Sequence, residues 1–141
     1  MLKELEFAWK KHPDKKYSDR QYLEFIVSGQ PLHEYLGVKE QSRVTPFGFF
    51  PDKKEQKRAL REFRFQQRSL LIDNRVELYI CEDCGDIRCG AITTKIIDEG
   101  DKIIWAQFAT QNDPEEISEL LAVEQIEFNR QDYFKAFSKI N

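Results

Sequence analysis

Three cysteines within nine residues are the part of this sequence whose residue types could carry chemistry. They lie in the segment Cys81-Glu82-Asp83-Cys84-Gly85-Asp86-Ile87-Arg88-Cys89-Gly90. A Cys-x-x-Cys pair followed by glycine is typical of a zinc knuckle, in which a tight turn brings two thiolates to one metal ion. Cys81, Cys84 and Cys89 are therefore candidate zinc ligands, and a histidine or Asp86 could supply a fourth. The sequence has no second Cys-x-x-Cys pair, so it holds half of the usual motif.

Two other interpretations of the same turn stay open. Cys81 and Cys84 could form a redox dithiol, although thioredoxin-like pairs stand at the start of a helix, whose dipole lowers the thiol pKa. Here a turn between strands is expected, and the carboxylates of Glu82, Asp83 and Asp86 should raise the thiol pKa instead. In the third interpretation the cysteines are only compact apolar residues that permit a tight connection.

The charge of the chain is unevenly distributed. Its 22 Lys and Arg against 25 Asp and Glu give a net charge of −3, which argues against a basic nucleic-acid-binding module. Residues 1–75 carry 16 basic and 11 acidic side chains, a net of +5, whereas residues 76–141 carry 6 and 14, a net of −8. The near-neutral total therefore conceals a basic half, with its helix-forming stretch 53–68, and an acidic half.

The acidic half predicts a surface for a basic protein, because opposed potentials speed encounter and select the partner. In one alternative, the acidic residues form a solvated face that favours solubility. In another, the basic stretch 53–68 binds an anionic ligand. The expected partner-binding residues are Asp98, Glu99, Asp101, Asp113, Glu115, Glu116, Glu119, Glu124 and Glu127. The leading hypothesis is a non-enzymatic bacterial immunity protein. It would neutralise a cognate basic toxin, for example a nuclease of a contact-dependent growth inhibition system. The second hypothesis is a small zinc-binding or thiol-redox protein that uses the three cysteines.

Catalytic motifs are not legible in the sequence. His12 and His33 are expected at the surface, without a Ser-His-Asp or Cys-His arrangement. We therefore expect no enzymatic activity, and no cofactor unless the cysteines bind zinc. Apolar runs are too short to span a bilayer, and charges interrupt the first nine residues as they do not in a signal peptide. The prediction is a cytoplasmic protein that binds neither membranes nor nucleic acid directly.

The expected fold is a single α+β domain over residues 1–141. Alternating and β-branched runs predict an antiparallel meander, with strands at about 76–81, 90–97, 102–109 and 125–128. Leu2, Leu5, Ala8 and Trp9 recur at helical spacing and predict a helix over 2–11. Further helices are expected over 18–29, 31–37, 53–70 and 115–121, and a last one begins at Asn129. In this prediction the N-terminal and C-terminal helices pack on one face of the sheet.

Residues 78–93, which contain the cysteine turn, resemble a widespread family of small bacterial proteins. That family carries Cys-x-x-Cys-Gly-Asp-x-x-Cys-Gly-Ala, then a Trp-x-x-Phe strand, then a Phe-x-Phe or similar pair. Trp105-Ala106-Gln107-Phe108 and Ile126-Glu127-Phe128 match in order, with weaker correspondences at 28–32 and 44–48. The resemblance covers roughly residues 28–138 and implies no catalytic residues. Some members are labelled oxidoreductases, but this chain has no Gly-x-Gly-x-x-Gly and no βαβ pattern to support that activity.

Overall fold

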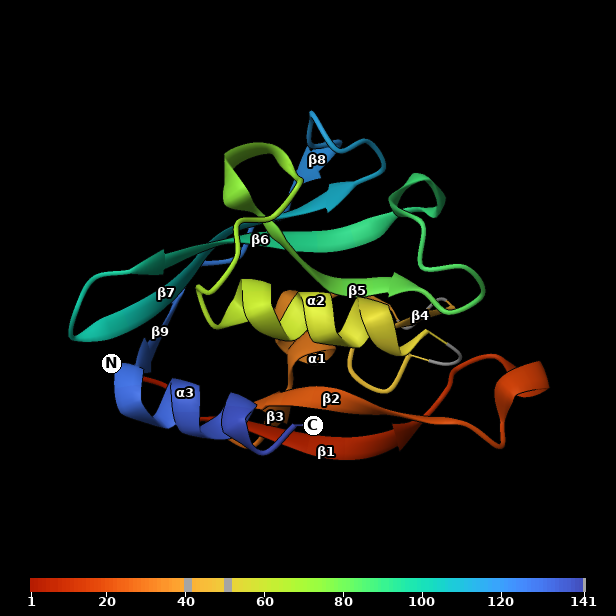
Figure 1. The fold of residues 1–141 in the computed structure, drawn as a ribbon, viewed down its shortest axis with the longest axis horizontal. Helices are drawn as coiled ribbons and strands as arrows, with labels where there is room; N and C mark the ends of the chain where they lie inside the picture. The colour runs from red at the N-terminus through yellow and green to blue at the C-terminus, as the bar shows by residue number, and fades with distance from the viewer. Residues whose placement is uncertain (40–41, 50–51, 141) are drawn as a thin grey trace.

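The computed structural model describes residues 1–39, 42–49 and 52–140, and these form nine strands in two antiparallel sheets (Figure 1). The first sheet has the order β1-β2-β3. Its strands are β1 (Leu5–Lys11), β2 (Gln21–Val27) and β3 (Gln30–Pro31). The long hairpin of β1 and β2 pairs Leu5 with Val27 at one end and Lys11 with Gln21 at the other.

The second sheet has six strands and carries most of the candidate functional residues. Its path runs β4-β5-β6-β7-β8, and β9 also pairs with β7. The strands are β4 (Arg43–Val44), β5 (Val76–Cys81), β6 (Ala91–Asp98), β7 (Lys102–Gln111), β8 (Glu119–Leu120) and β9 (Ile126–Asn129). β6 pairs with one edge of β7. On the other edge, β9 lies beside the first half of β7 and β8 lies beside its second half.

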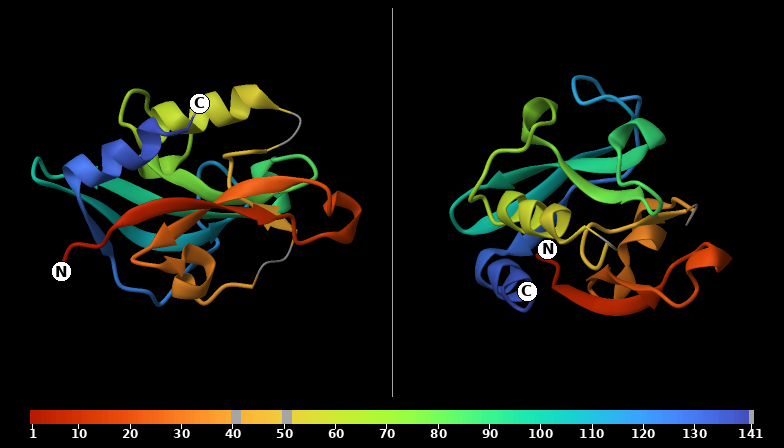
Figure 2. Two further views of the ribbon diagram at one scale, coloured as in Figure 1. Left: turned by 90° about the horizontal axis from the view of Figure 1, so that it is seen from below. Right: turned by 45° about the vertical axis from the view of Figure 1, so that its right-hand side comes forward.

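Three α-helices complete the fold of the described residues. α2 (Lys53–Phe63) and α3 (Arg130–Ser138) lie together on one side of the strands, and α1 (Leu32–Leu36) lies on the other (Figure 2). Asp52 caps α2 by accepting from the Lys54 amide at 2.9 Å, and Asn129 caps α3 in the same way. Short 3-10 helices are η1 (Lys15–Tyr17), η2 (Ile72–Asn74) and η3 (Ile87–Cys89). None of the helices that the described residues form is long and apolar enough to cross a membrane.

Backbone hydrogen bonds connect each sheet to a segment that adjoins a strand of the other. The amide of Lys3, just before β1, donates to the Glu127 carbonyl of β9 at 2.7 Å. The Leu23 amide of β2 donates at 2.9 Å to the carbonyl of Phe47, which lies in the loop after β4. Between the sheets, rings from different elements pack edge to face, tilted or stacked, with centroid separations of 5.1 to 6.2 Å. They include Phe25, Phe47, Phe63, Tyr79, Trp105 and Phe137. This core fixes β5, β6 and β7, and these strands position the candidate sites.

The predicted α+β architecture is wrong, because the N-terminal half begins with a β-hairpin and not with helices. The stretches 2–11 and 18–29, expected to be helical, form mainly β1 and β2. Of the four residues whose spacing suggested the first helix, only Leu5 is buried, whereas Leu2 and Trp9 are 45% and 63% exposed. Long-range pairing of β1 with β2 thus overrides a coincidental helical spacing.

Other elements differ from the expected four-stranded meander in extent and partners. The predicted strands exist as β5, β6, β7 and β9, but within a larger sheet that also contains β4 and β8. The helix expected over 53–70 ends at Phe63, after which Phe65 adopts a left-handed conformation with φ of 60°. Residues 115–121, expected to be helical, contribute β8 to the edge of β7.

Candidate functional site

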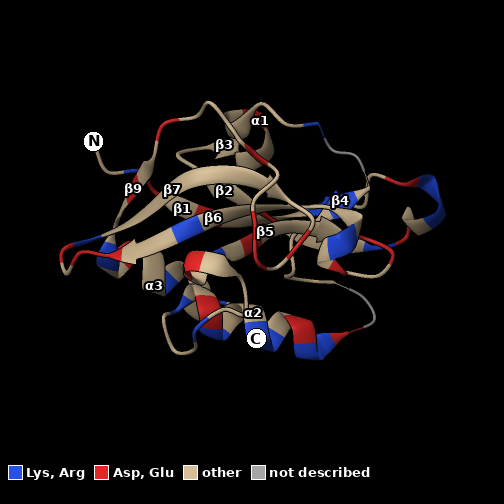
Figure 3. Cartoon of the chain, turned by 90° about the horizontal axis from the view of Figure 1, so that it is seen from above, with Lys and Arg blue, Asp and Glu red and all other residues tan. Residues whose placement is uncertain are grey.

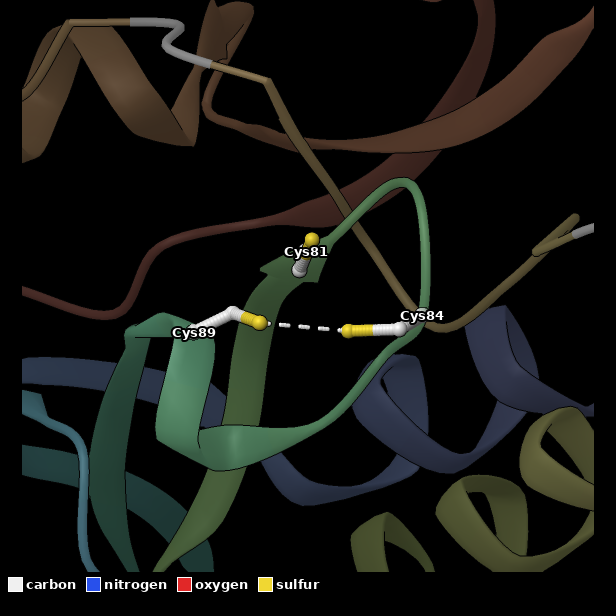
Figure 4. A group of neighbouring side chains, drawn as sticks. All are labelled: Cys81, Cys84 and Cys89. Carbon is white, nitrogen blue, oxygen red and sulfur yellow. Dashed lines mark hydrogen bonds between the residues drawn. The ribbon is translucent and has the colours of Figure 1, made fainter.

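The cysteine turn, residues 81–90, connects β5 to β6 and brings three sulfurs together (Figure 4). Cys81 ends β5, Cys84 lies in the loop and Cys89 ends η3. The three Sγ atoms lie within 4.8 Å of one another, and those of Cys84 and Cys89 are 3.2 Å apart. All three thiols are free, Cys81 is half-buried, and Cys84 and Cys89 are exposed. Thus the predicted grouping of three cysteines is present.

A backbone amide of the turn is directed at one of the sulfurs: the Asp86 amide donates to Sγ of Cys84 at 3.4 Å. Partial burial raises the pKa of the Cys81 thiol, but the polar backbone around it and the neighbouring thiols outweigh this effect and hold that pKa below its usual value. The hydrogen bond with Cys84 raises the pKa of Cys89 to about 11, and desolvation acts in the same direction. One sulfur of the group is therefore favoured as the thiolate.

The carboxylates of the turn do not have the effect on Cys81 that the sequence suggested. Glu82 is buried and its Oε2 lies 3.0 Å from Nδ1 of His12. Asp83 accepts from the Tyr17 hydroxyl at 2.5 Å and pairs with Lys16 at 3.0 Å. Both groups are thus engaged with the β1–β2 hairpin, which explains why the pKa of Cys81 is not raised.

Neither histidine is a surface residue, and neither belongs to the sulfur group. His12 is 5% exposed and pairs with Glu82, whereas Nδ1 of His33 lies 2.9 Å from Oε2 of Glu24. Asp86 caps η3 by accepting from the Arg88 amide. Within the described part of the chain, the group of close metal-ligating atoms at this turn consists of the three cysteines. The expected fourth ligand from the same chain is therefore not found there.

Sequence reasoning missed a buried polar cluster around Glu24. This β2 carboxylate is 1% exposed and accepts from the Tyr79 hydroxyl at 2.5 Å and from the Phe25 amide at 2.8 Å, besides contacting His33. Burial and the nearby Glu24 carboxylate raise the pKa of Tyr79 well above its usual value, so the phenol stays a donor at neutral pH. The sequence contains one indication of this cluster, since Glu24 is the single charged residue in the apolar run from Tyr22 to Val27.

The predicted partner-binding carboxylates lie in two groups at opposite ends of β7. Asp98, Glu99 and Asp101 belong to the β6–β7 hairpin, at the left tip of the molecule in Figure 3. A second group follows the strand and comprises Asp113, Glu115, Glu116 and Glu119. A strand of ten residues spans about 33 Å, so the two groups cannot contact one small surface together.

The other two of the nine predicted carboxylates, Glu124 and Glu127, belong to neither group, and Asp98 of the first group is ion-paired. Asp98 forms an ion pair with Arg130 at 3.1 Å, and Glu127 pairs with Lys102 at 3.2 Å. Glu124 is exposed in the segment between β8 and β9. The Arg130 hydrogen bond holds the pKa of Asp98 below its usual value, and the Lys102 hydrogen bond does the same for Glu127. These paired charges are less available to a partner.

The loop after β7 combines its carboxylates with exposed apolar side chains. Ile117 is 36% and Leu120 is 54% exposed. The Ile72 amide donates to the Pro114 carbonyl at 2.8 Å, which places the segment with exposed Leu70 and Ile72 beside this loop. We call this surface the acidic end; its residues are Leu70, Ile72, Asp113, Glu115, Glu116, Ile117, Glu119 and Leu120. The sequence did not reveal its apolar part, because Leu70 and Ile72 are distant along the chain.

Comparisons of the chain with protein-family models, curated proteins and solved structures gave no match. The resemblance of residues 78–93 to a bacterial family therefore stays a prediction.

Proposed function

We propose that the chain is a non-enzymatic protein-binding module whose acidic end binds a basic protein. The observation that carries this proposal is that four exposed apolar side chains and four carboxylates come from two segments that the Ile72–Pro114 hydrogen bond holds side by side. Apolar side chains contribute contact area that loses water on binding, and the surrounding charges select the partner and speed encounter. Residues 111–127 contain no Lys or Arg, so this loop contributes only negative charge.

The proposed partner is a basic toxin, and the proposed role is that of a bacterial immunity protein acting in the cytoplasm. An enzyme that cleaves nucleic acid presents Lys and Arg to the phosphates of its substrate. An acidic inhibitor can cover that surface by mimicking the charge of the substrate. The loop after β7 fits such a role, because its carboxylates Glu115, Glu116 and Glu119 are exposed to solvent.

The test uses the purified product of the gene beside that of this chain, inactivated if it is toxic. We expect binding in calorimetry that weakens as salt is added. The triple variant Glu115→Gln/Glu116→Gln/Glu119→Gln should bind about tenfold more weakly, at roughly 0.5 kcal/mol for each exposed charge. Leu120→Ser should also weaken binding, because it removes apolar contact area.

The matched control is Glu99→Gln/Asp101→Asn, which removes two charges at the opposite end of β7. Its affinity should equal that of the unsubstituted chain within about twofold. Failure of the neighbouring gene product to bind would contradict the immunity role. Equal weakening by the control variant would show that total charge, and not the acidic end, governs binding.

A further inference from the structure

The cysteine turn carries an inference that is independent of the acidic end. We propose that Cys81, Cys84 and Cys89 together bind one thiophilic d10 metal ion, Zn²⁺ or Cu⁺. Thiolates are soft ligands that favour these ions over magnesium, calcium or manganese. The site would be a feature of the finished fold and not a condition for folding.

The spacing of the three sulfurs suits a single small ion. With a Zn–S distance of about 2.3 Å, two sulfurs of a tetrahedral site lie about 3.8 Å apart. The sulfurs of Cys84 and Cys89 are separated by 3.2 Å, and every pair lies within 4.8 Å. Each separation is thus within about 1 Å of the required value, a change that side-chain rotation can supply. Figure 4 shows Cys84 and Cys89 pointing toward each other, with Cys81 beside them.

The backbone of the turn is shaped to surround sulfur anions. The Gly85 amide donates to the Cys81 carbonyl at 2.9 Å, and Gly85 adopts a φ of 69° that favours glycine. The same turn directs the Asp86 amide at Sγ of Cys84, at 3.4 Å. A hydrogen bond from an amide to sulfur stabilises a thiolate ligand, so the loop supplies a polar support that a merely compact connection would not need.

A bound cation balances the charge that its ligands acquire. Binding releases the thiol protons, and the cation offsets the mutual repulsion of the three resulting thiolates. Glu82 and Asp83 are turned toward His12, Lys16 and Tyr17, so they are engaged elsewhere.

The exposure of the turn indicates how an ion would enter and what would complete its coordination. Cys84 and Cys89 are exposed, so the ion can reach them directly from solvent. Three protein ligands leave one position of a tetrahedral ion open to water or to a small exogenous ligand.

The fold does not depend on this ion. β5 and β6, which flank the turn, are paired with each other, and buried apolar side chains such as Leu78 and Ile92 anchor them in the core. Removal of the ion should therefore leave secondary structure and thermal stability nearly unchanged, in contrast to a zinc finger, which unfolds without metal.

The test is a metal titration of the full chain under anaerobic conditions with a non-thiol reductant. Zn²⁺ and Cu⁺ are each titrated in competition with a chromophoric chelator, and these two arms distinguish the ions. We expect one equivalent of at least one ion per chain. Replacement of any of the three cysteines by serine should weaken the affinity of the chain for the metal ion by about 100-fold or more. Even groups that only hydrogen-bond to a metal ligand contribute about 10- to 100-fold to affinity. Co²⁺ loading gives a second readout, a sulfur-to-metal charge-transfer band whose intensity each serine variant should reduce, because each variant removes one of the three thiolates.

Arg88→Ser is the matched control, since Arg88 is exposed in the same turn and offers no metal ligand. Its metal affinity should stay within about twofold of that of the unsubstituted chain. Circular dichroism of the metal-free serine variants should show an intact fold. Absence of stoichiometric binding of both ions, with three thiols titratable, overturns the proposal. A Cys84–Cys89 disulfide in the anaerobically isolated protein, or full affinity in any one serine variant, overturns it as well.

Discussion

Replacement of Arg58 by methionine is expected to lower the free energy of unfolding by about 3 kcal/mol at pH 8 and by much less at pH 5. Arg58 lies on the buried side of α2 and donates to three carboxylates. These are Glu62 at 2.7 Å, Glu77 at 3.3 Å and Glu55. Glu62 and Glu77 are 3% and 9% exposed, so the loss of Arg58 leaves two buried carboxylates without their cation.

The pH dependence follows from the direction of the pKa shifts. Burial raises the pKa of Glu77 from 4.5 to about 7, against the opposing effect of Arg58, and burial also raises the pKa of Glu62. A carboxyl group with a raised folded-state pKa contributes most stability below its unfolded-state pKa, and that contribution is lost as the pH rises through the folded-state pKa. Removing Arg58 raises both folded-state values further. The variant should therefore lose most stability above pH 7 and recover as the two groups become protonated toward pH 5.

Urea denaturation from pH 5 to pH 8 measures this effect, with the fluorescence of buried Trp105 as one reporter of unfolding. Arg61→Met is the control, because Arg61 is an exposed residue of the same helix; its effect should stay below about 0.5 kcal/mol. An equal loss for Arg58→Met at pH 5 and pH 8 would contradict the role of the carboxylates. Glu77→Gln should flatten the stability profile between pH 5 and pH 7.

The parts of the fold that depend on neighbouring residues could be predicted from the sequence. The three cysteines are close in the chain, so their convergence follows from a tight turn between two recognisable strands. The separation of the hairpin carboxylates from those after β7 also follows from the predicted strand over 102–109. Net charge alone assigns both sets of carboxylates to one binding surface, because a count of charges says nothing about the distance between them.

The features that depend on distant residues could not be predicted. Glu24 and Tyr79 are 55 positions apart, and His12 and Glu82 are 70 apart, so no local pattern pairs them. The β1–β2 hairpin is a related case. Its alternation is weak, since the burial of β2 does not alternate regularly, and pairing with β1 decides its conformation. Apolar spacing that fits a helix therefore misled the prediction for the N-terminal half.

Replacement of Glu24 by alanine is expected to lower the free energy of unfolding by about 3–5 kcal/mol at pH 7. The Glu24 carboxylate lies between β2, α1 and β5, where it accepts from Tyr79 and contacts His33. Without it, the buried Tyr79 hydroxyl loses its acceptor, and the remaining cavity is lined by groups that had been paired. The two sheets also lose a direct polar connection between their inner faces.

A double-mutant cycle separates the hydrogen bond from the loss of packing. Tyr79→Phe alone should cost about 1–2 kcal/mol. Adding it to Glu24→Ala should cost less than that, because the hydroxyl is already unpaired in the alanine variant. Glu6→Ala is the matched control, since Glu6 is an exposed carboxylate on the adjacent strand β1; its effect should be below about 0.5 kcal/mol. Strict additivity of the Glu24 and Tyr79 substitutions would show that their hydrogen bond does not stabilise the fold. A loss for Glu24→Ala as small as that of Glu6→Ala would contradict the buried position of this carboxylate.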